Sequence, residues 1–533
     1  MENLEPGAHG RNLRPGRRQA TRSGRKVRAG SGARPARHRD GLGVIDIGSN
    51  SIRLVVYDRL ARALQPVFNE KVLCGLGRGL ARTGYLHEEG RRLAIDNLVR
   101  FKALAEAMEV GRLKVLATAA VREAKDGPEF VELVERRTGF SVEVLSGGDE
   151  ARLSAMGVLS AMPGADGLMG DLGGGSLEVV ALDHGHLGHH RTLPLGPLRL
   201  KELPDLGRKA LREAIDKRLA ELPWLAEVKD RDFHAVGGAW RALARIHMGQ
   251  SDYPIQVIHN YVLARDKAVD FLDLIAGMSR SSLEQMAQVQ RKRLDTLPLA
   301  ALVLQRLLLR AQPRRLIFSA LGLREGSLFA ELPPAERRRD PLIEGARQMA
   351  ERSARFVLDG GHLASWIEPL FANRVRPDAA AAKRLRLAAC FLGDIAWNEH
   401  PDSRAEIAFL RILRSQLIGL DHADRAFLAL AAHARYGGSL DDVDAQAVAQ
   451  RLLTEEAAAE AMLVGRSLRL AFGLSGGAPS VLKRISLRLE AQSLCLVVPR
   501  SRASLIGEMV TRRFEGLAST MGRRSRIEIG RTR

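Results

Sequence analysis

Cysteine and aromatic residues are scarce in this chain, and it contains no long apolar run. Cys74, Cys390 and Cys495 lie far apart, without the spacing of a disulfide framework or a zinc site. Aromatic residues make up 5% of the 533 positions, too few for a surface that stacks single-stranded nucleic-acid bases. No apolar run approaches the ~20 residues of a membrane span, and the N-terminus lacks the apolar segment of a secretory signal. These absences predict a cytoplasmic protein without membrane contact.

Several common binding and catalytic motifs are also missing. No Gly-x-x-x-x-Gly-Lys-Ser/Thr segment occurs, which argues against a P-loop nucleotide hydrolase. The glycines between Cys74 and Gly79 lack the dinucleotide-binding spacing, and no Ser-His-Asp arrangement can be identified. Four of the 14 histidines fall within residues 183–190. A metal site is one interpretation of that segment, and a solvated hairpin turn is the favoured one.

Positive charge is in excess and unevenly distributed. The chain carries 82 lysine and arginine residues against 62 acidic ones, a formal net charge of +20. Residues 1–40 hold eleven of the basic residues and three of the acidic ones, so the rest of the chain carries +12. We expect residues 1–40 to be a disordered basic tail, for which nucleic-acid contact is an option that no motif supports. The basic body would attract a polyanionic ligand by electrostatic steering.

Two short glycine-rich runs, each opened by an aspartate, are the most informative feature. Asp46-Ile47-Gly48-Ser49-Asn50-Ser51 and Asp171-Leu172-Gly173-Gly174-Gly175-Ser176 both follow an apolar strand. Glycines let the backbone turn tightly and direct N–H donors at an anion. Because the two runs occupy equivalent places in successive α/β segments, they predict a phosphate chain clamped between two domains.

Asp46 and Asp171 are candidate anchors for Mg²⁺. This ion is commonly held by one or two carboxylates together with water and substrate phosphate. Each aspartate could instead cap its own turn, and for one aspartate alone the two interpretations are equally good. The matching context of both favours the metal.

Glu150 and Arg122 are candidate catalytic side chains. In the segment Ser146–Leu153 we expect Asp149 to cap a helix and Glu150 to lie in its first turn, where the helix dipole keeps a carboxylate ionised and able to accept a proton from water. From spacing alone, an ordinary first-turn glutamate is the favoured interpretation. Arg122 follows a strand directed at the same cleft and offers a planar fork of donors to phosphate; a surface arginine is an equally good interpretation.

Strands and helices alternate twice along the first 330 residues, which predicts sheets covered on both faces. Pro333, Pro334 and Pro341 mark a boundary. The chain beyond them is helical, and its last part alternates like an antiparallel strand pair. We expect six regions: a basic tail at 1–40, α/β domains at 41–153 and 154–332, a helical domain at 333–468, a small domain at 469–515 and a basic tail at 516–533.

The motifs named above, together with Leu323-Arg324-Glu325-Gly326, resemble the exopolyphosphatase / guanosine pentaphosphate phosphohydrolase family of the actin-like superfamily. The resemblance covers about residues 42–330. It implies an α/β fold of two actin-like (ribonuclease H-like) domains, followed by an all-α HD-like domain and a small C-terminal α+β domain. It also implies Mg²⁺-dependent hydrolysis of terminal phosphoanhydrides and a homodimer.

The resemblance assigns roles residue by residue. Glu150 looks like the family's catalytic glutamate, which reverses the interpretation that spacing favoured, and Arg122 would assist at the phosphate. Asp171, Asp46 and Glu178 would lie at the metal. The phosphate-binding residues would be Ser49, Asn50, Ser51, Gly173, Gly174, Gly175 and Ser176. In the helical domain Gly393 stands where an HD motif places histidine, so no metal is assigned there.

Together these features predict an exopolyphosphatase that releases terminal orthophosphate from inorganic polyphosphate by attack of a Glu-activated water. The nearest alternative is a guanosine pentaphosphate 5′-phosphohydrolase, which uses the same chemistry. A second alternative is a non-hydrolytic module that binds nucleotide or nucleic acid. A kinase is a further option, against which the family resemblance argues.

Overall fold

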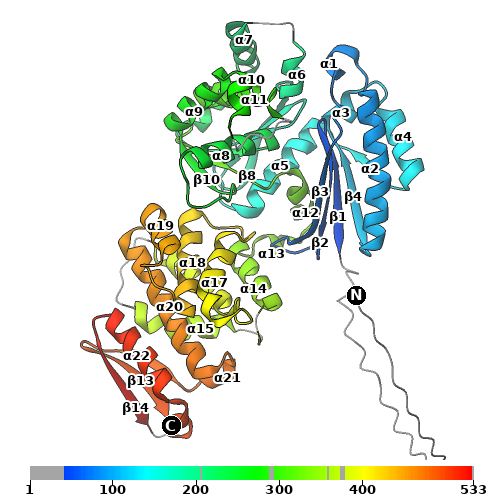
Figure 1. Ribbon diagram of the computed structural model, residues 1–533. Helices are drawn as coiled ribbons and strands as arrows, with labels where there is room; N and C mark the ends of the chain where they lie inside the picture. Colours follow the sequence, from blue (N-terminus) through cyan, green and yellow to red (C-terminus); the bar gives the residue numbers. More distant parts are fainter. Residues whose placement is uncertain are drawn as a thin grey trace, which may run out of the picture. The chain divides into compact units, whose positions relative to one another are not determined.

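The computed structural model describes residues 41–203, 207–286, 293–353, 355–356, 359–372 and 378–530. The predicted basic tail at 1–40 lies outside these residues, as do residues 531–533. The described chain forms two mixed α/β halves, a helical segment and a three-stranded sheet near the C-terminus (Figure 1). No described helix is long and apolar enough to span a bilayer.

The first half is built on a five-stranded sheet in the order β3-β2-β1-β4-β5. β1 pairs antiparallel with β2 and parallel with β4. Apolar side chains of α2 and α4 bury one face of this sheet, as expected for helices with an apolar stripe. The elements are β1 (Leu42–Ile47), β2 (Ser51–Tyr57), β3 (Pro66–Leu73), α1 (Leu80–Thr83), α2 (Glu88–Ala107), β4 (Arg112–Ala117), α3 (Ala119–Glu123), α4 (Gly127–Thr138) and β5 (Val142–Val144).

The second half is built on a six-stranded sheet in the order β10-β11-β9-β6-β7-β8. A large apolar core, to which α7, α8, α9 and α11 contribute, lies against it. The elements are α5 (Gly147–Ala161), β6 (Gly167–Leu172), β7 (Leu177–Asp183), β8 (His186–Leu193), α6 (Pro197–Lys201), α7 (Arg208–Leu219), β9 (Asp232–Val236), α8 (Gly238–Gln250), β10 (Tyr261–Ala264), α9 (Arg265–Gly277), α10 (Arg280–Glu284), α11 (Leu297–Ala311) and β11 (Arg315–Phe318).

The two halves repeat one arrangement, as the sequence predicted. In each, a strand is joined by a short turn to an antiparallel partner and pairs in parallel with a later strand. The turns close with equivalent hydrogen bonds of 3.0 Å, from Gly48 N to Ser51 O and from Gly173 N to Ser176 O. Asp46 and Asp171 therefore occupy matching positions, each next to the last residue of its strand.

α5 and α12 (Leu323–Phe329) cross each other and pack against the first sheet. Leu153 of α5 and Leu328 of α12 join Val44 and Leu116 in one buried cluster, and α5 also covers β6 and β7. α12 belongs by sequence to the region expected at 154–332, yet its apolar residues complete the core of the first half.

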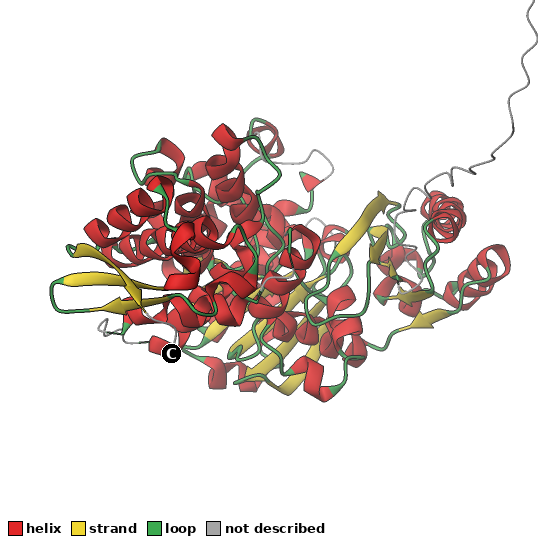
Figure 2. Ribbon diagram, turned by 90° about the horizontal axis from the view of Figure 1, so that it is seen from below, coloured by secondary structure: helices red, strands yellow, loops and turns green. Residues whose placement is uncertain are grey.

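The helical segment and the C-terminal sheet share one apolar core. α20 runs through the boundary expected at residue 468, and the last sheet, in the order β12-β13-β14, lies beside the helices (Figure 2). The elements are α13 (Pro334–Arg337), α14 (Pro341–Ser353), α15 (Gly360–Ile367), α16 (Ala379–Phe391), α17 (Arg404–Leu413), α18 (His422–Tyr436), α19 (Val443–Leu452), α20 (Glu455–Ser475), α21 (Pro479–Leu482), β12 (Ser486–Leu489), β13 (Ser493–Pro499), α22 (Glu508–Thr520) and β14 (Arg524–Gly530).

The expectation of a basic tail at 516–533 is wrong for residues 516–530, the part that the structure describes. α22 continues to Thr520, and β14 pairs in parallel with β13 over seven residues. The arginines that suggested a tail are compatible with an edge strand, because Arg526 pairs with Glu490 and Glu528. The expected antiparallel pair is confirmed as β12 and β13.

We predict that Gly157→Ala destabilises the fold, because α5 and α12 meet through glycines. A Cβ at Gly157 would clash with Gly322 O, a backbone atom that cannot move aside without shifting α12. Overpacking of this kind costs about 1–3 kcal/mol or more, which outweighs the ~1 kcal/mol that alanine gains over glycine in a helix. Gly164→Ala is the matched control, since the space that its methyl group would fill is open. Equal urea-denaturation midpoints for the two variants would contradict the close packing of α5 on α12.

Candidate active site

The two glycine-rich turns lie against each other where the sheets meet. A Cβ on Gly174 would be 3.1 Å from Ser49 Cβ, which is tighter than most real Cβ contacts, so glycine favours this close approach. The carbonyl groups of the turns are held from behind, by Gly77 N on Ser49 O at 2.7 Å and by Leu198 N on Gly174 O at 2.9 Å. Within the described chain, the N–H groups of Ser49, Asn50, Gly174 and Gly175 make no hydrogen bond, so they are free to bind an anion.

A cavity of about 180 Å³ opens between these turns. Most of the predicted residues line it, and Gly175 lines a small recess beside it. Arg122 joins them through its hydrogen bond to Glu150, and Glu178 lies opposite Asp171 in the strand register. The predicted residues that line the cavity are Asp46, Ser49, Asn50, Ser51, Glu150, Asp171, Gly173, Gly174 and Ser176.

α5 begins at the mouth of this cavity and carries Glu150 in its first turn. The cap is Ser146, whose hydroxyl accepts a hydrogen bond from Asp149 N at 3.1 Å. The expectation that Asp149 caps the helix is therefore wrong. The helix starts earlier than expected because Ser146 already satisfies the free N–H group.

Glu150 is buried, with 8% of its surface exposed. Arg122 Nη1 donates to its Oε2 at 2.9 Å and to Leu145 O at 2.8 Å, so the structure brings the two predicted catalytic residues together. Burial raises the pKa of Glu150 to about 7, against the opposing effect of Arg122. The expectation that the helix dipole holds this carboxylate fully ionised is therefore corrected: desolvation outweighs the dipole and brings the pKa close to neutral.

Asp171 and Glu178 form an acidic row on the second sheet. Asp171 Oδ2 accepts a hydrogen bond from Ser154 Oγ at 2.6 Å, whereas Oε1 of Glu178 is buried and has no partner among the described residues. Burial and the neighbouring carboxylates raise the pKa of both groups. A buried, unpartnered carboxylate oxygen beside a second carboxylate is a donor set that fits a hard divalent cation.

Asp46 lies on the first sheet and, unlike Asp171 and Glu178, is paired with an arginine. Its Oδ2 accepts a hydrogen bond from Arg324 Nη1 at 2.7 Å, which leaves Oδ1 for a cation. Asp46, Asp171 and Glu178 do not form a compact group of metal ligands. Among the described residues, the group whose ligand atoms all lie within 4.8 Å of one another is Asp166, Asp183 and His184. That group is at the opposite end of β6 from Asp171, and Arg231 already pairs with both of its carboxylates.

Sequence reasoning gave no site role to five basic residues at the cleft, although Arg324 stood in a motif of the family resemblance: Arg53, Lys71, Arg241, Arg293 and Arg324. A signal was present for the first two. Asp46 lies opposite Arg53, which lies opposite Lys71, so the three form one row across β1, β2 and β3. Period-two alternation from Asp46 would have located this row, but β3 was not recognised as a strand. Arg241 and Arg293 carry no motif.

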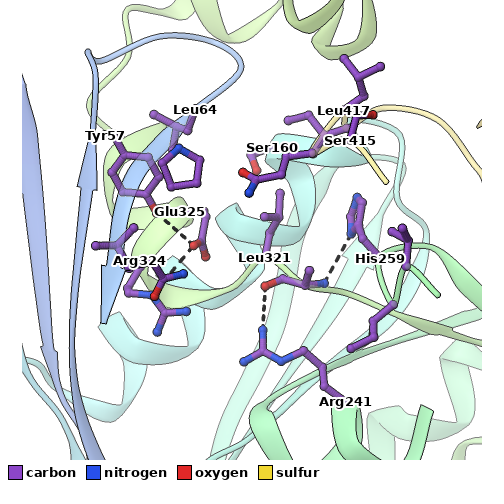
Figure 3. A pocket seen from close by; sticks show the side chains of 18 of the residues that line it. Tyr57, Leu64, Ser160, Arg241, His259, Leu321, Arg324, Glu325, Ser415 and Leu417 are labelled. Atoms are coloured by element: carbon purple, nitrogen blue, oxygen red, sulfur yellow. Dashed lines mark hydrogen bonds and ion pairs between the residues drawn. The ribbon is translucent and has the colours of Figure 1, made fainter. Parts of the chain in front are cut away.

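These five residues also line a second, larger cavity of about 640 Å³ (Figure 3). Its described lining includes nine arginine and lysine side chains and a single carboxylate, Glu325. Glu325 accepts hydrogen bonds from Tyr57 Oη at 3.1 Å and Gly322 N at 3.0 Å. Arg414 and Arg425 of the helical segment complete the wall. The two cavities share the five basic residues named above, and Glu150 lines only the smaller one.

Comparison with known proteins adds independent information. The model of the Ppx/GppA phosphatase family matches residues 55–335, and that of the exopolyphosphatase C-terminal domain matches residues 342–527. Retrograde regulation protein 2 of Saccharomyces cerevisiae is 27% identical over 470 residues, 79% of this chain and 77% of the yeast protein. Exopolyphosphatase 1 of Mycobacterium tuberculosis is 29% identical over 308 residues, 55% of this chain and 88% of the relative. The crystal structure of an exopolyphosphatase from Cytophaga hutchinsonii shares the fold, with a TM-score of 0.50 and 23% identity over 54% of this chain and 97% of the other.

We predict that Arg324→Met destabilises the protein strongly. Its loss leaves Asp46 and Glu325 without their buried countercharge, and removing one partner of a buried ion pair costs about 3–5 kcal/mol. Arg59→Met is the control, because the pair of Arg59 with Glu351 is about half exposed and such pairs contribute little. The measurement is the urea-denaturation midpoint followed by circular dichroism. An Arg324→Met midpoint equal to that of Arg59→Met would exclude a supporting role for this pair.

Proposed function

The chain belongs to the Ppx/GppA phosphatase family, and on that premise we propose that it is an exopolyphosphatase acting on inorganic polyphosphate. The terminal phosphate would occupy the cavity between the glycine-rich turns. The N–H groups of Ser49, Asn50, Gly174 and Gly175 and the hydroxyl of Ser176 would bind its oxygens. A hydrolytic water, activated by Glu150, would release it as orthophosphate.

One observation carries this proposal: the cleft shares five basic residues with a larger, strongly basic cavity. A chain of linked phosphates needs a row of cations beyond the reacting end, and Arg53, Lys71 and Arg241 lie where the two cavities join. Guanidinium groups bind phosphate through charge-assisted hydrogen bonds. A substrate with a single terminal phosphate would leave these cations without countercharge.

In the proposed mechanism Glu150 accepts a proton from the attacking water. Its raised pKa suits this role, because a base whose pKa lies near the working pH is both ionised and able to hold the proton. Arg122 positions the carboxylate through the hydrogen bond at 2.9 Å. It can also offset charge that develops on the departing phosphate.

Mg²⁺ would be held by Asp171 and Glu178, with Oδ1 of Asp46 on the other side of the cleft. When bound, the ion neutralises charge on the phosphate oxygens. The free Oε1 of Glu178 is the feature that supports this assignment.

We predict that Glu150→Gln lowers kcat by about 10²–10⁴-fold, the usual contribution of a general base, with little change in polyphosphate binding. Asp149→Asn, an exposed change on the same helix turn, is the matched control and should retain activity. Phosphate release is measured from long-chain polyphosphate and from guanosine pentaphosphate in parallel. A Glu150→Gln enzyme with normal turnover would refute the assignment, and faster wild-type turnover of the nucleotide would favour the alternative substrate.

We predict that KM for polyphosphate rises with pH through the titration of Lys71. Lys71 keeps an exposed surface at the cleft, but partial desolvation, together with Arg293, Arg241 and Arg53, lowers its pKa to about 8. Lys71 is therefore cationic at pH 7 and neutral at pH 9, and it loses its attraction for the chain. Losing one charge-assisted contact of about 1.4 kcal/mol corresponds to a roughly tenfold higher KM.

Lys71→Arg tests this assignment directly, because arginine stays charged over the whole range. The variant should keep a low KM at pH 9, whereas Lys71→Met should have a high KM at both pH values. If KM of Lys71→Arg rises with pH as in the wild type, another group is responsible.

A further inference from the structure

The helical segment contains a third cavity, of about 560 Å³, that none of the chemistry above uses. It shares no lining residue with the cleft or with the large basic cavity. Its charged lining residues among the described ones are Arg355, Asp394, Arg404, Arg435, Arg469 and Arg513. The wall comes from α17, α18, α20 and α22 and from the residues before α17.

Positive charge in this cavity is far from balanced. Asp394 is fully buried and accepts two hydrogen bonds of 3.0 Å from Arg355, with Arg435 at 3.7 Å. Its single negative charge is thus shared between two guanidinium groups. Arg469 and Arg513 contact each other through a backbone carbonyl, with Arg513 Nη1 3.4 Å from Arg469 O. Clustered cations repel one another, and an anion between them would offset that repulsion.

Arg435 is the most deeply buried cation in the wall of this cavity among the described residues. It is 8% exposed, yet its Nε has no hydrogen-bond partner in the described chain. Its guanidinium is fixed over the rings of Phe472 at 4.1 Å and Tyr436 at 4.6 Å. The carboxylate that faces it, Asp394 at 3.7 Å, already accepts both hydrogen bonds from Arg355, so an anion in the cavity would offset the excess positive charge.

We propose that this cavity is a second anion-binding site, for a ligand that carries several phosphate groups. Five arginines in fork geometry suit phosphate oxygens, which accept paired hydrogen bonds. Trp397 and Tyr436 also line the cavity, and Trp397 is 36% exposed. An aromatic ring of this kind can stack on a nucleobase. The shared chemistry is thus a polyphosphate group, free or attached to a nucleoside.

The test is a titration of the full chain with tripolyphosphate by isothermal calorimetry, in the presence of EDTA so that the probe is not hydrolysed. The wild type should bind two equivalents, one in the cleft and one in the helical segment. The double variant Arg469→Gln/Arg513→Gln should bind one, or bind the second at least tenfold more weakly. Arg512→Gln is the matched control, an exposed neighbour on α22 that does not line the cavity.

A parallel titration with GTP separates the two ligand sources. GTP binding that the double variant loses assigns the site to a nucleotide, and loss of tripolyphosphate binding alone assigns it to the inorganic chain. Unchanged stoichiometry and affinity for both probes in the double variant would overturn the proposal. Should the double variant not fold by circular dichroism, Arg469→Lys/Arg513→Lys replaces it. That variant keeps the charge but loses the paired donors, so it should bind more weakly than the wild type.

Polyphosphate hydrolysis by the double variant distinguishes this inference from the proposed function. If the double variant still hydrolyses polyphosphate but no longer binds the second equivalent of tripolyphosphate, the site is separate from the cleft. An inactive wild type that still binds two equivalents would refute the hydrolase and leave this site standing.

Discussion

The cleft depends on the contact between two backbone turns, one from each sheet. Because the facing residues are a serine and a glycine, the turns approach to van der Waals distance. Their carbonyl groups are bonded from behind, and several N–H groups remain free. The other groups at the site lie around these free N–H donors. A larger residue at Gly174 would press on Ser49 and Leu198, which would have to give by a few tenths of an ångström.

The duplicated halves have diverged in charge while keeping one geometry. The row across the first sheet is Asp46, Arg53 and Lys71, and the equivalent row across the second is Asp171, Glu178 and Thr192. The first row is suited to an anion and the second to a cation. Glu178 in the second row is buried, whereas in the first row Arg53 is half-buried and Lys71 is exposed, so the two rows differ in their contact with water. An anionic substrate together with its metal ion would satisfy both at once.

Much of this arrangement could be predicted from sequence, because strand–turn–strand units carry local signals. The matched turns and the alternating strands followed from spacing, and the family resemblance added Arg122 and Glu150 at one cleft. The pKa of Glu150 could not be predicted, since it depends on burial by elements distant in sequence. Nor does spacing explain why glycine stands at position 393. Phe472 lies 2.9 Å from where a Cβ would be, and Asp394 is engaged by Arg355. Packing between residues that are far apart in the chain produces no periodic pattern in the sequence.

The hydrogen bond between Ser154 and Asp171 links α5 to the second sheet. Ser154 belongs to α5, the helix that also carries Glu150, while Asp171 ends a strand of the second sheet. One hydroxyl group therefore sets the spacing between the base and the acidic row. Arg122 of the first half also donates to Glu150, so any separation of the two sheets would have to break that hydrogen bond or carry Arg122 along with α5.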